Sequence, residues 1–174
     1  MGFTGLKKKS AIQALEKQLK KLKSNDLVPT KIEKIGVLAD SRLFGSYDIT
    51  RNLRQKLGIS EQEQIDIIIY ENIKDDFVTQ HYSTFTDKDF GMYGKAKGNV
   101  VGFVADNYDL LINYCNHESV YTNLIVLQAK AKFKVGFFDE TMQSVYDFTI
   151  DIEGNKVDIF NDELAKYLKI LKLV

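Results

Sequence analysis

The chain has 174 residues, of which 44% are apolar and 11% aromatic, enough for the core of one folded domain and too many for a disordered chain. No apolar run approaches the ~18 residues of a transmembrane helix, and no apolar segment follows the N-terminal lysines, so we expect a cytoplasmic protein. Cys115 is the single cysteine, which excludes an internal disulfide, and the two histidines, His81 and His117, are too few to build a zinc site with it, so neither a metal nor a cofactor is expected.

The formal net charge of zero hides two oppositely charged parts of the chain. Residues 1–24 carry seven lysines and one glutamate, a charge of +6, and the remaining 17 basic and 23 acidic residues give residues 25–174 a charge of −6. The most acidic stretch is 139–163, where eight carboxylates stand against Lys156 alone. This division separates a basic leading segment from an acidic body.

The N-terminal segment predicts a basic amphipathic helix. Its apolar stripe recurs at spacings of three, four and three residues, at Ile12, Leu15, Leu19 and Leu22. Ser10 with Gln13 forms a plausible capping box, although the helix could extend backwards through the preceding lysines. Seven lysines fall mostly off the stripe and are the candidate contacts for RNA or another anion: Lys7, Lys8, Lys9, Lys17, Lys20, Lys21 and Lys23. We expect residues 1–30 to form this helix and a linker, and residues 31–174 to form an α/β domain.

From Lys34 onwards, short apolar runs alternate with helical periods, a pattern typical of β-α-β units. The runs predict strands at 34–40, 65–71, 109–115, 133–139 and 146–153, and helices at 46–58, 99–107, 118–131 and 161–174, with residues 72–98 irregular apart from one short strand near 81–85. Ser46 is the expected N-cap of the second helix and Gly58 its end, while Asp162 and Glu163 suit the first turn of the last helix. The predicted fold is a single three-layer, Rossmann-like α/β domain with a mainly parallel sheet of about five strands.

Several blocks in this order resemble an uncharacterised family of small bacterial cytoplasmic proteins, a domain of unknown function. The blocks are the run from Tyr93 to Lys97, then "YDLLINY", "AKAKFKVGFF", "YDFTIDIE" and a terminal "YLKIL" helix. The resemblance covers roughly residue 30 to the end of the chain. It implies a compact Rossmann-like fold and brings no activity and no catalytic residue.

Candidate pocket residues follow two of the predicted strands, at the edge where open α/β sheets bind their ligands. Asp40, Ser41 and Arg42 follow the first strand, but neither a G-x-G-x-x-G nor a G-x-x-x-x-G-K-[ST] motif accompanies them, which disfavours a dinucleotide or P-loop site. Cys115 ends the strand at 109–115 and His117 follows two residues later, and the two could act as nucleophile and base. The favoured interpretation is a buried Cys115 and a surface His117, because Glu118 opposes thiolate formation.

The basic helix leaves four interpretations open: docking on the acidic 139–163 stretch of the same or a second copy, contact with RNA or a ribosome, pairing with an acidic protein, and, less favoured, binding to a membrane surface. A lysine-only helix suits sequence-independent phosphate contact. We therefore expect a non-catalytic protein that binds RNA or a ribosome through this helix. The alternative is a small-molecule or nucleotide-binding domain, or an enzyme related to one half of a two-domain glycosyltransferase, which the strands near 65–71, 109–115 and 131–137 faintly resemble.

Overall fold

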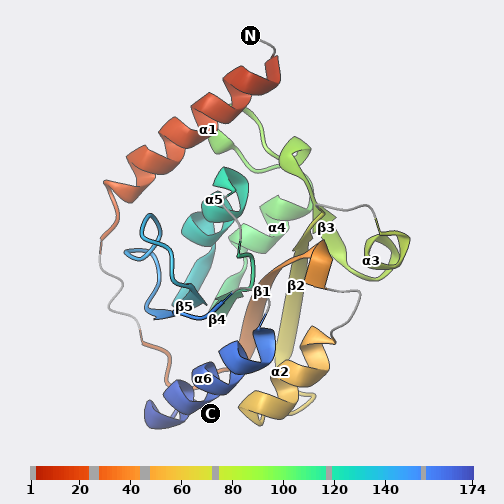
Figure 1. Ribbon diagram of the computed structural model, residues 1–174, viewed down its shortest axis with the longest axis vertical. Coiled ribbons are helices and arrows are strands. Elements are labelled where there is room, and N and C mark those ends of the chain that lie inside the picture. The colour runs from red at the N-terminus through yellow and green to blue at the C-terminus, as the bar shows by residue number, and fades with distance from the viewer. Residues whose placement is uncertain (1–2, 24–27, 44–47, 72–74, 117–118, 154–155) are drawn as a thin grey trace.

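The computed structural model describes residues 3–23, 28–43, 48–71, 75–116, 119–153 and 156–174. Within these residues the chain forms a six-stranded, all-parallel sheet with the strand order β3-β2-β1-β4-β5-β6 (Figure 1). The strands are β1 Lys34–Asp40, β2 Gln64–Tyr70, β3 Ser83–Phe85, β4 Asn107–Asn113, β5 Lys130–Phe137 and β6 Phe148–Ile150. The α/β class and the parallel sheet are confirmed, with six strands in place of about five.

The central strand β1 is buried along almost its whole length, as its continuous apolar run predicts. Val37 aligns with Ile67 of β2 on one side and with Ile112 of β4 on the other. The strand that the sequence places only loosely, β3, pairs with Ile68–Tyr70, the last three residues of β2. Among the described residues, the outer edge of the first half of β2 therefore has no neighbouring strand.

Two layers of helices cover the sheet. They are α1 Phe3–Leu19, α2 Ile49–Leu57, α3 Asp76–His81, α4 Asn99–Ala105, α5 Val120–Gln128 and α6 Val157–Ile170, and 3-10 turns lie at η1 Ser41–Leu43, η2 Asp87–Asp89 and η3 Met92–Gly94. Helices α2 and α6 share one apolar cluster with the sheet, and α4, α5 and α1 share a cluster on the opposite face. In Figure 1, α1 lies outermost, beyond α5 and far from α2 and α6, so the three-layer domain carries an additional helix on one side.

The start of α2 corrects one prediction. The Asp48 carboxylate accepts a hydrogen bond from the backbone N–H of Arg51 (3.0 Å) and caps the helix. The predicted cap, Ser46, lies outside the described residues. The predicted end is confirmed, because Gly58 adopts the left-handed conformation (φ +66°) that terminates the helix.

The buried side of α1 also differs from its predicted stripe. The helix begins at Phe3, so Ser10 lies inside it and does not cap it. Its buried residues are Ser10, Ala11 and Leu15, whereas Ile12 and Leu22 remain 39% exposed. Small side chains at positions 10 and 11 permit a close approach to the neighbouring segments, and this packing overrides the leucine and isoleucine periodicity.

The C-terminal region shows two further differences. Helix α6 begins four residues before the predicted start, so Asp162 lies in the middle of the helix, where its carboxylate pairs with Lys56 of α2 (2.7 Å). Strand β6 ends at Ile150, and Asp151 and Glu153 therefore lie beyond it. Beyond the strand, the Glu153 carboxylate pairs with Lys156, the residue that precedes α6 (2.6 Å).

Candidate functional sites: the basic helix and the carboxyl edge of the sheet

Helix α1 is fixed to the domain by contacts near its middle. The Ser10 hydroxyl accepts a hydrogen bond from the backbone N–H of Tyr93 in η3 (3.0 Å) and donates one to the carbonyl of Lys7 (2.8 Å). Ala11 and Leu15 join the apolar cluster that contains α5. The sequence left open whether this helix packs or protrudes, and the structure places it against α5 and η3.

One of the seven candidate lysines belongs to this anchoring. The Lys7 amine donates to the backbone carbonyl of Asp87 and lies 5.7 Å from the ring centroid of Tyr121. The Asp87 carboxylate in turn accepts a hydrogen bond from the Tyr70 hydroxyl at the end of β2 (2.8 Å). These contacts connect α1 to the carboxyl edge of the sheet.

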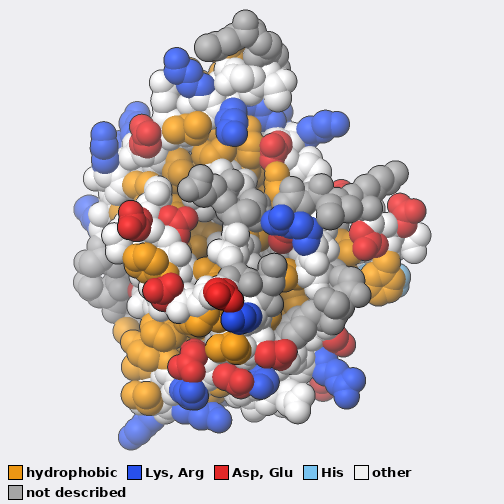
Figure 2. All heavy atoms as spheres, viewed as in Figure 1, with side chains coloured by type: hydrophobic (Ala, Val, Ile, Leu, Met, Phe, Trp, Pro, Cys, Tyr) orange, Lys and Arg blue, Asp and Glu red, His pale blue; other side chains and the backbone are white. Residues whose placement is uncertain are grey.

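The other six lysines project from α1 and the turn that follows it. All six are exposed: Lys8, Lys9, Lys17, Lys20, Lys21 and Lys23. Within the described residues none of the six is in an ion pair. Figure 2 shows basic side chains projecting along the part of the surface that α1 occupies. We call these six residues the lysine face.

The carboxyl ends of the two central strands gather buried polar side chains. The strand order reverses between β1 and β4, and at such a point open α/β sheets bind ligands outside the strand ends. Asp40 ends β1 and is 3% exposed, Ser41 follows it at 5%, and Asn113 ends β4 at 4%. These are three of the six buried polar residues in the described chain. Burying polar groups costs free energy unless they are hydrogen-bonded, so this concentration requires a dedicated network.

The Asp40 carboxylate is held by Arg42. It accepts hydrogen bonds from the backbone N–H (2.9 Å), Nε (3.0 Å) and Nη2 (2.9 Å) of Arg42. The hydrogen bonds to Asp40 raise the pKa of Arg42, so the guanidinium stays charged, and about half of its surface faces solvent. The charge of Arg42 is therefore already neutralised by Asp40. Arg42 should bind a further anion more weakly than an unpaired arginine would.

Asn113 links the end of β4 to the segment before β6. Its amide donates to the Tyr146 hydroxyl (2.8 Å), and its carbonyl oxygen accepts the backbone N–H of Cys115 (2.9 Å). A hollow of about 430 Å³ opens beside these groups. Its remaining walls carry amides, hydroxyls, carboxylates and phenyl rings, from Asn116, Asn123, Phe137, Phe138, Asp139, Glu140 and Thr141. This is a polar hollow, and none of the described residues that line it is a lysine or an arginine.

Cys115 lies at this edge as a buried thiol. Burial raises its pKa well above the usual value, and the charges of Asp40 and Arg42 both act on it. A nucleophilic cysteine needs a lowered pKa and access, so this environment opposes thiolate chemistry. His117, the proposed base, lies outside the described residues. Of the five candidate pocket residues, the structure gathers Asp40, Ser41, Arg42 and Cys115 at one edge of the sheet.

Sequence reasoning missed Asn113 and Tyr146. Asn113 interrupts the apolar run of a central strand, and a polar residue in such a run signals a hydrogen-bonding role. Tyr146 gave no comparable signal, because its ring reaches β4 and β5 only through the tertiary fold. It packs so closely on Gly136 that a Cβ there would lie 2.6 Å from the ring.

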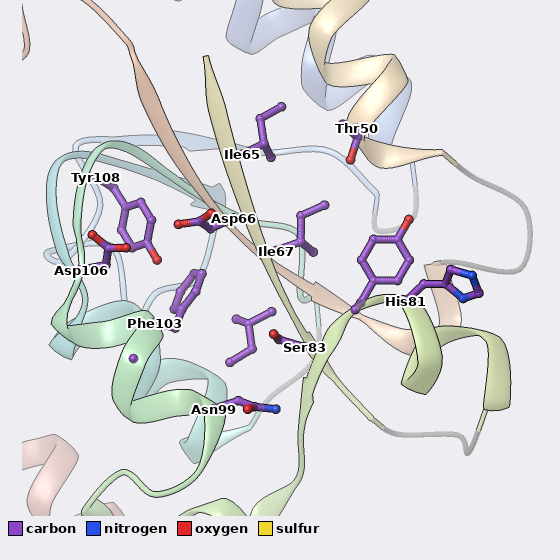
Figure 3. A pocket seen from close by; sticks show the side chains of 13 residues that line it. Thr50, Ile65, Asp66, Ile67, His81, Ser83, Asn99, Phe103, Asp106 and Tyr108 are labelled. Atoms are coloured by element: carbon purple, nitrogen blue, oxygen red, sulfur yellow. The ribbon is translucent and has the colours of Figure 1, made fainter. Parts of the chain in front are cut away.

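A further hollow lies beside β2. With a volume of about 520 Å³, it runs around this strand, with Asp66, Phe103, Asp106 and Tyr108 on one side and Thr50 and His81 on the other (Figure 3). The two carboxylates in it already pair with Lys34, at 3.2 Å and 2.5 Å. Among the described residues, no group of three or more His, Cys, Asp or Glu side chains could hold a metal ion. Both carboxylates of this hollow are therefore already paired with Lys34.

Comparison with known proteins gives a family and no activity. None of the helices in the described part of the chain combines the length and hydropathy that a bilayer crossing requires. No curated protein matches the chain. A family model described as "Family of unknown function (DUF6913)" matches residues 7–171, which include the basic helix from its first lysine, the whole sheet and α6. The chain therefore belongs to this family of unknown function.

Proposed function

We propose that the protein binds an anionic macromolecule, RNA or an RNA surface such as the ribosome, through the lysine face of α1. The observation that carries the proposal is the orientation of this helix: Ser10, Ala11 and Leu15 fix it to the domain, while six lysines face solvent without ion pairs among the described residues. A docked helix presents these charges without first paying the entropy of ordering a free arm.

The composition of the face supports phosphate contact without base reading. Lysine is a point charge suited to phosphate oxygens, whereas base-specific contacts favour the planar fork of arginine. Helix α1 contains no arginine, and its lysines Lys8, Lys9 and Lys17 are exposed to solvent. This pattern supports binding to many phosphates of a structured RNA with little sequence preference.

A membrane surface is a weaker candidate. An interfacial helix inserts its apolar side into lipid, but the most buried side of α1 is already covered by α5 and η3. The apolar residues left outside, Leu6, Ile12 and Leu22, are scattered among lysines and are only partly exposed. Anionic macromolecules in solution fit this surface better than lipid does.

The test uses the full chain and replaces charge without removing the helix. Lys17, Lys20 and Lys21 are changed together to Gln, and the control changes Lys166, Lys169 and Lys172, three exposed lysines in and just after α6 on the other side of the sheet. Binding to purified ribosomes and to a structured RNA is measured at several salt concentrations. We expect the α1 variant to bind more weakly and the slope of log K against log[salt] to fall by about 2–3, at ~0.7–0.9 for each of the three phosphate contacts removed.

The α6 control variant is expected to bind like the unaltered protein. Equal losses in the two variants would mean that only net charge matters, and equal affinities of both variants and the parent would remove the lysine face from any binding role. Circular dichroism and the denaturation midpoint of each variant confirm that the fold is intact, since exposed Lys→Gln changes cost little stability.

A second candidate function rests on the concentration of buried polar groups at the carboxyl edge. The described residues that line the hollow of about 430 Å³ there include no lysine or arginine and carry two carboxylates, so we infer that it takes a small polar ligand without a negative charge. Nucleosides and sugars are tested for an increase in the thermal midpoint, with Thr141→Val as the variant because Thr141 lines the hollow and is exposed. Stabilisation of the parent and not of the variant is expected; an equal response, or none, contradicts this function.

A further inference from the structure

A hollow of about 540 Å³ lies where the end of α1 meets the sheet. Leu19 and Leu22 form its wall on the helix side, and the opposite wall is lined by Ala129, Lys130, Ala131, Lys134, Ser144, Val145, Tyr146 and Asp147. Lys23, a member of the lysine face, also lines the hollow. The hollow is therefore continuous with the surface that we propose to contact an anionic polymer.

Lys134 brings a partly buried cation into this hollow. Its amine donates to the backbone carbonyls of Val126 (2.8 Å) and Leu127 (3.4 Å) in the last turn of α5, where a cation complements the negative end of the helix. Burial lowers the pKa of Lys134 to about 8. These two bonds account for two of the three ammonium hydrogens.

No described carboxylate lies within ion-pair distance of the Lys134 amine. The nearest acidic influence is Asp147, but its carboxylate accepts a hydrogen bond from the backbone N–H of Lys134 (2.7 Å) and does not meet the ammonium. A desolvated cation without a counter-ion is costly in a protein interior. The end of α5 and the more distant Asp147 offset part of the ammonium charge, and no described carboxylate pairs with it directly.

The rest of the lining supplies what an anion would need. Lys23 and Lys130 are exposed lysines on opposite walls, and the Ser144 hydroxyl is a further donor. Together with Lys134 they give three positive charges against the single carboxylate of Asp147. The apolar side chains of Leu19, Leu22 and Val145 line the same space, so the fitting ligand carries an anionic group on an organic body.

We propose that this hollow binds the phosphate monoester of a nucleotide, with Lys23, Lys130 and Lys134 around the phosphate and the apolar wall against the base or sugar. The phosphate can belong to a free mononucleotide or to the end of an RNA strand; the second source rests on the proposed function of the lysine face.

The experiment compares ligands that differ only in the phosphate. Binding of AMP and of adenosine is measured by calorimetry, and binding of a short single-stranded RNA with either a 5′-phosphate or a 5′-hydroxyl is measured by fluorescence anisotropy, all with the full chain. The variants are Lys23→Gln with Lys130→Gln, which leaves the helix cap intact, and Lys134→Met, which keeps the stem of the side chain. The control is Lys166→Gln with Lys169→Gln on α6.

We expect the parent to bind AMP and not adenosine. We expect the double variant and Lys134→Met each to lose at least tenfold in AMP affinity while the control loses none. If the phosphate belongs to an RNA end, the parent should in addition bind the 5′-phosphate RNA about tenfold more tightly than the 5′-hydroxyl RNA. The double variant should bind the two RNAs equally. If AMP binds but no RNA does, the hollow is a free-nucleotide site and the proposed function fails alone. If RNA binds equally with either end and AMP does not bind, this inference is overturned and the lysine face stands.

Discussion

Replacing Gly94 by alanine tests the contact that seats η3 beneath α1. Gly94 adopts φ +67°, and a Cβ built on it would lie 2.6 Å from Cδ1 of Leu124, a fully buried side chain of α5. The left-handed conformation costs a residue with a side chain about 1–2 kcal/mol, and forcing a methyl group into a packed core costs about 1–3 kcal/mol more. We expect Gly94→Ala to lower the free energy of unfolding by about 2–5 kcal/mol.

Gly58 provides the matched control for this substitution. Its φ is +66°, almost the same, yet nothing lies within 4 Å of the position that a Cβ would occupy. Gly58→Ala therefore carries the backbone cost alone, and any gain from reducing the freedom of the unfolded chain is the same for both variants. The difference between the two isolates the clash with Leu124.

The assay is urea denaturation of the parent and both variants, with unfolding monitored by far-ultraviolet circular dichroism. Gly94→Ala should be the less stable variant by about 1–3 kcal/mol, the packing cost alone. Equal stability of the two variants within about 0.5 kcal/mol would refute the close approach of η3 to α5 and with it the account of how α1 is seated.

Three shorter predictions concern buried polar groups. Asn161→Ala should lower the free energy of unfolding by about 2–4 kcal/mol, measured by urea denaturation. The buried Asn161 amide accepts a hydrogen bond from the hydroxyl of Tyr114, just after β4 (2.6 Å), and donates one to Asn52 of α2 (2.9 Å). A loss below about 0.5 kcal/mol would contradict this network. The pKa of Lys134 is about 8 in the folded protein and 10.5 ordinarily, so between these pH values the unfolded chain binds more protons than the folded one. The free energy of unfolding of the parent, relative to that of Lys134→Met, should therefore increase as pH rises from about 8 towards 10.5. A difference between the two proteins that does not change with pH would contradict the burial of Lys134. Cys115 should react with Ellman's reagent at pH 8 only after unfolding, and rapid reaction of the native protein would show an open thiol.

The sequence predicts the central sheet well because continuous apolar runs have few alternative structures. The run at 34–40 became β1 without a shift in either boundary, and Ile49, Leu53 and Leu57 all face the core as their spacing predicts. Cap positions were less predictable, since Ser46 and Asp48 are equally suited in composition to begin a helix. Only the geometry of the chain selects Asp48.

Only some residues of the candidate sites could be predicted from the sequence, for a physical reason. The carboxyl ends of parallel strands meet at one edge, so Asp40, Arg42 and Cys115 could be expected together from strand order alone. Tyr146 and Lys134 reach their positions through the packing of β5 against α5 and the segment before β6, contacts between residues whose spacing carries no periodic signal. The lysines of the lysine face could be identified from the sequence, but the side of α1 that packs on the domain could not. Ser10 and Ala11 are buried because they are small, and their hydropathy does not distinguish them from exposed residues.

The docking of α1 on α5 also determines the order in which the chain can complete its structure during synthesis. Helix α1 ends at Leu19, and its docking helix begins at Val120, about 100 residues later in translation. At ~5–20 residues per second, the basic helix leaves the ribosome roughly 5–20 s before the surface that covers Ala11 and Leu15 exists. The β1-α2-β2 unit can pair in that interval, since its strands are close in sequence, whereas α1 must wait beside the nascent chain. Docking of α1 therefore cannot precede the synthesis of α5, and refolding of the full chain should show α1 acquiring protection from hydrogen exchange after the central strands.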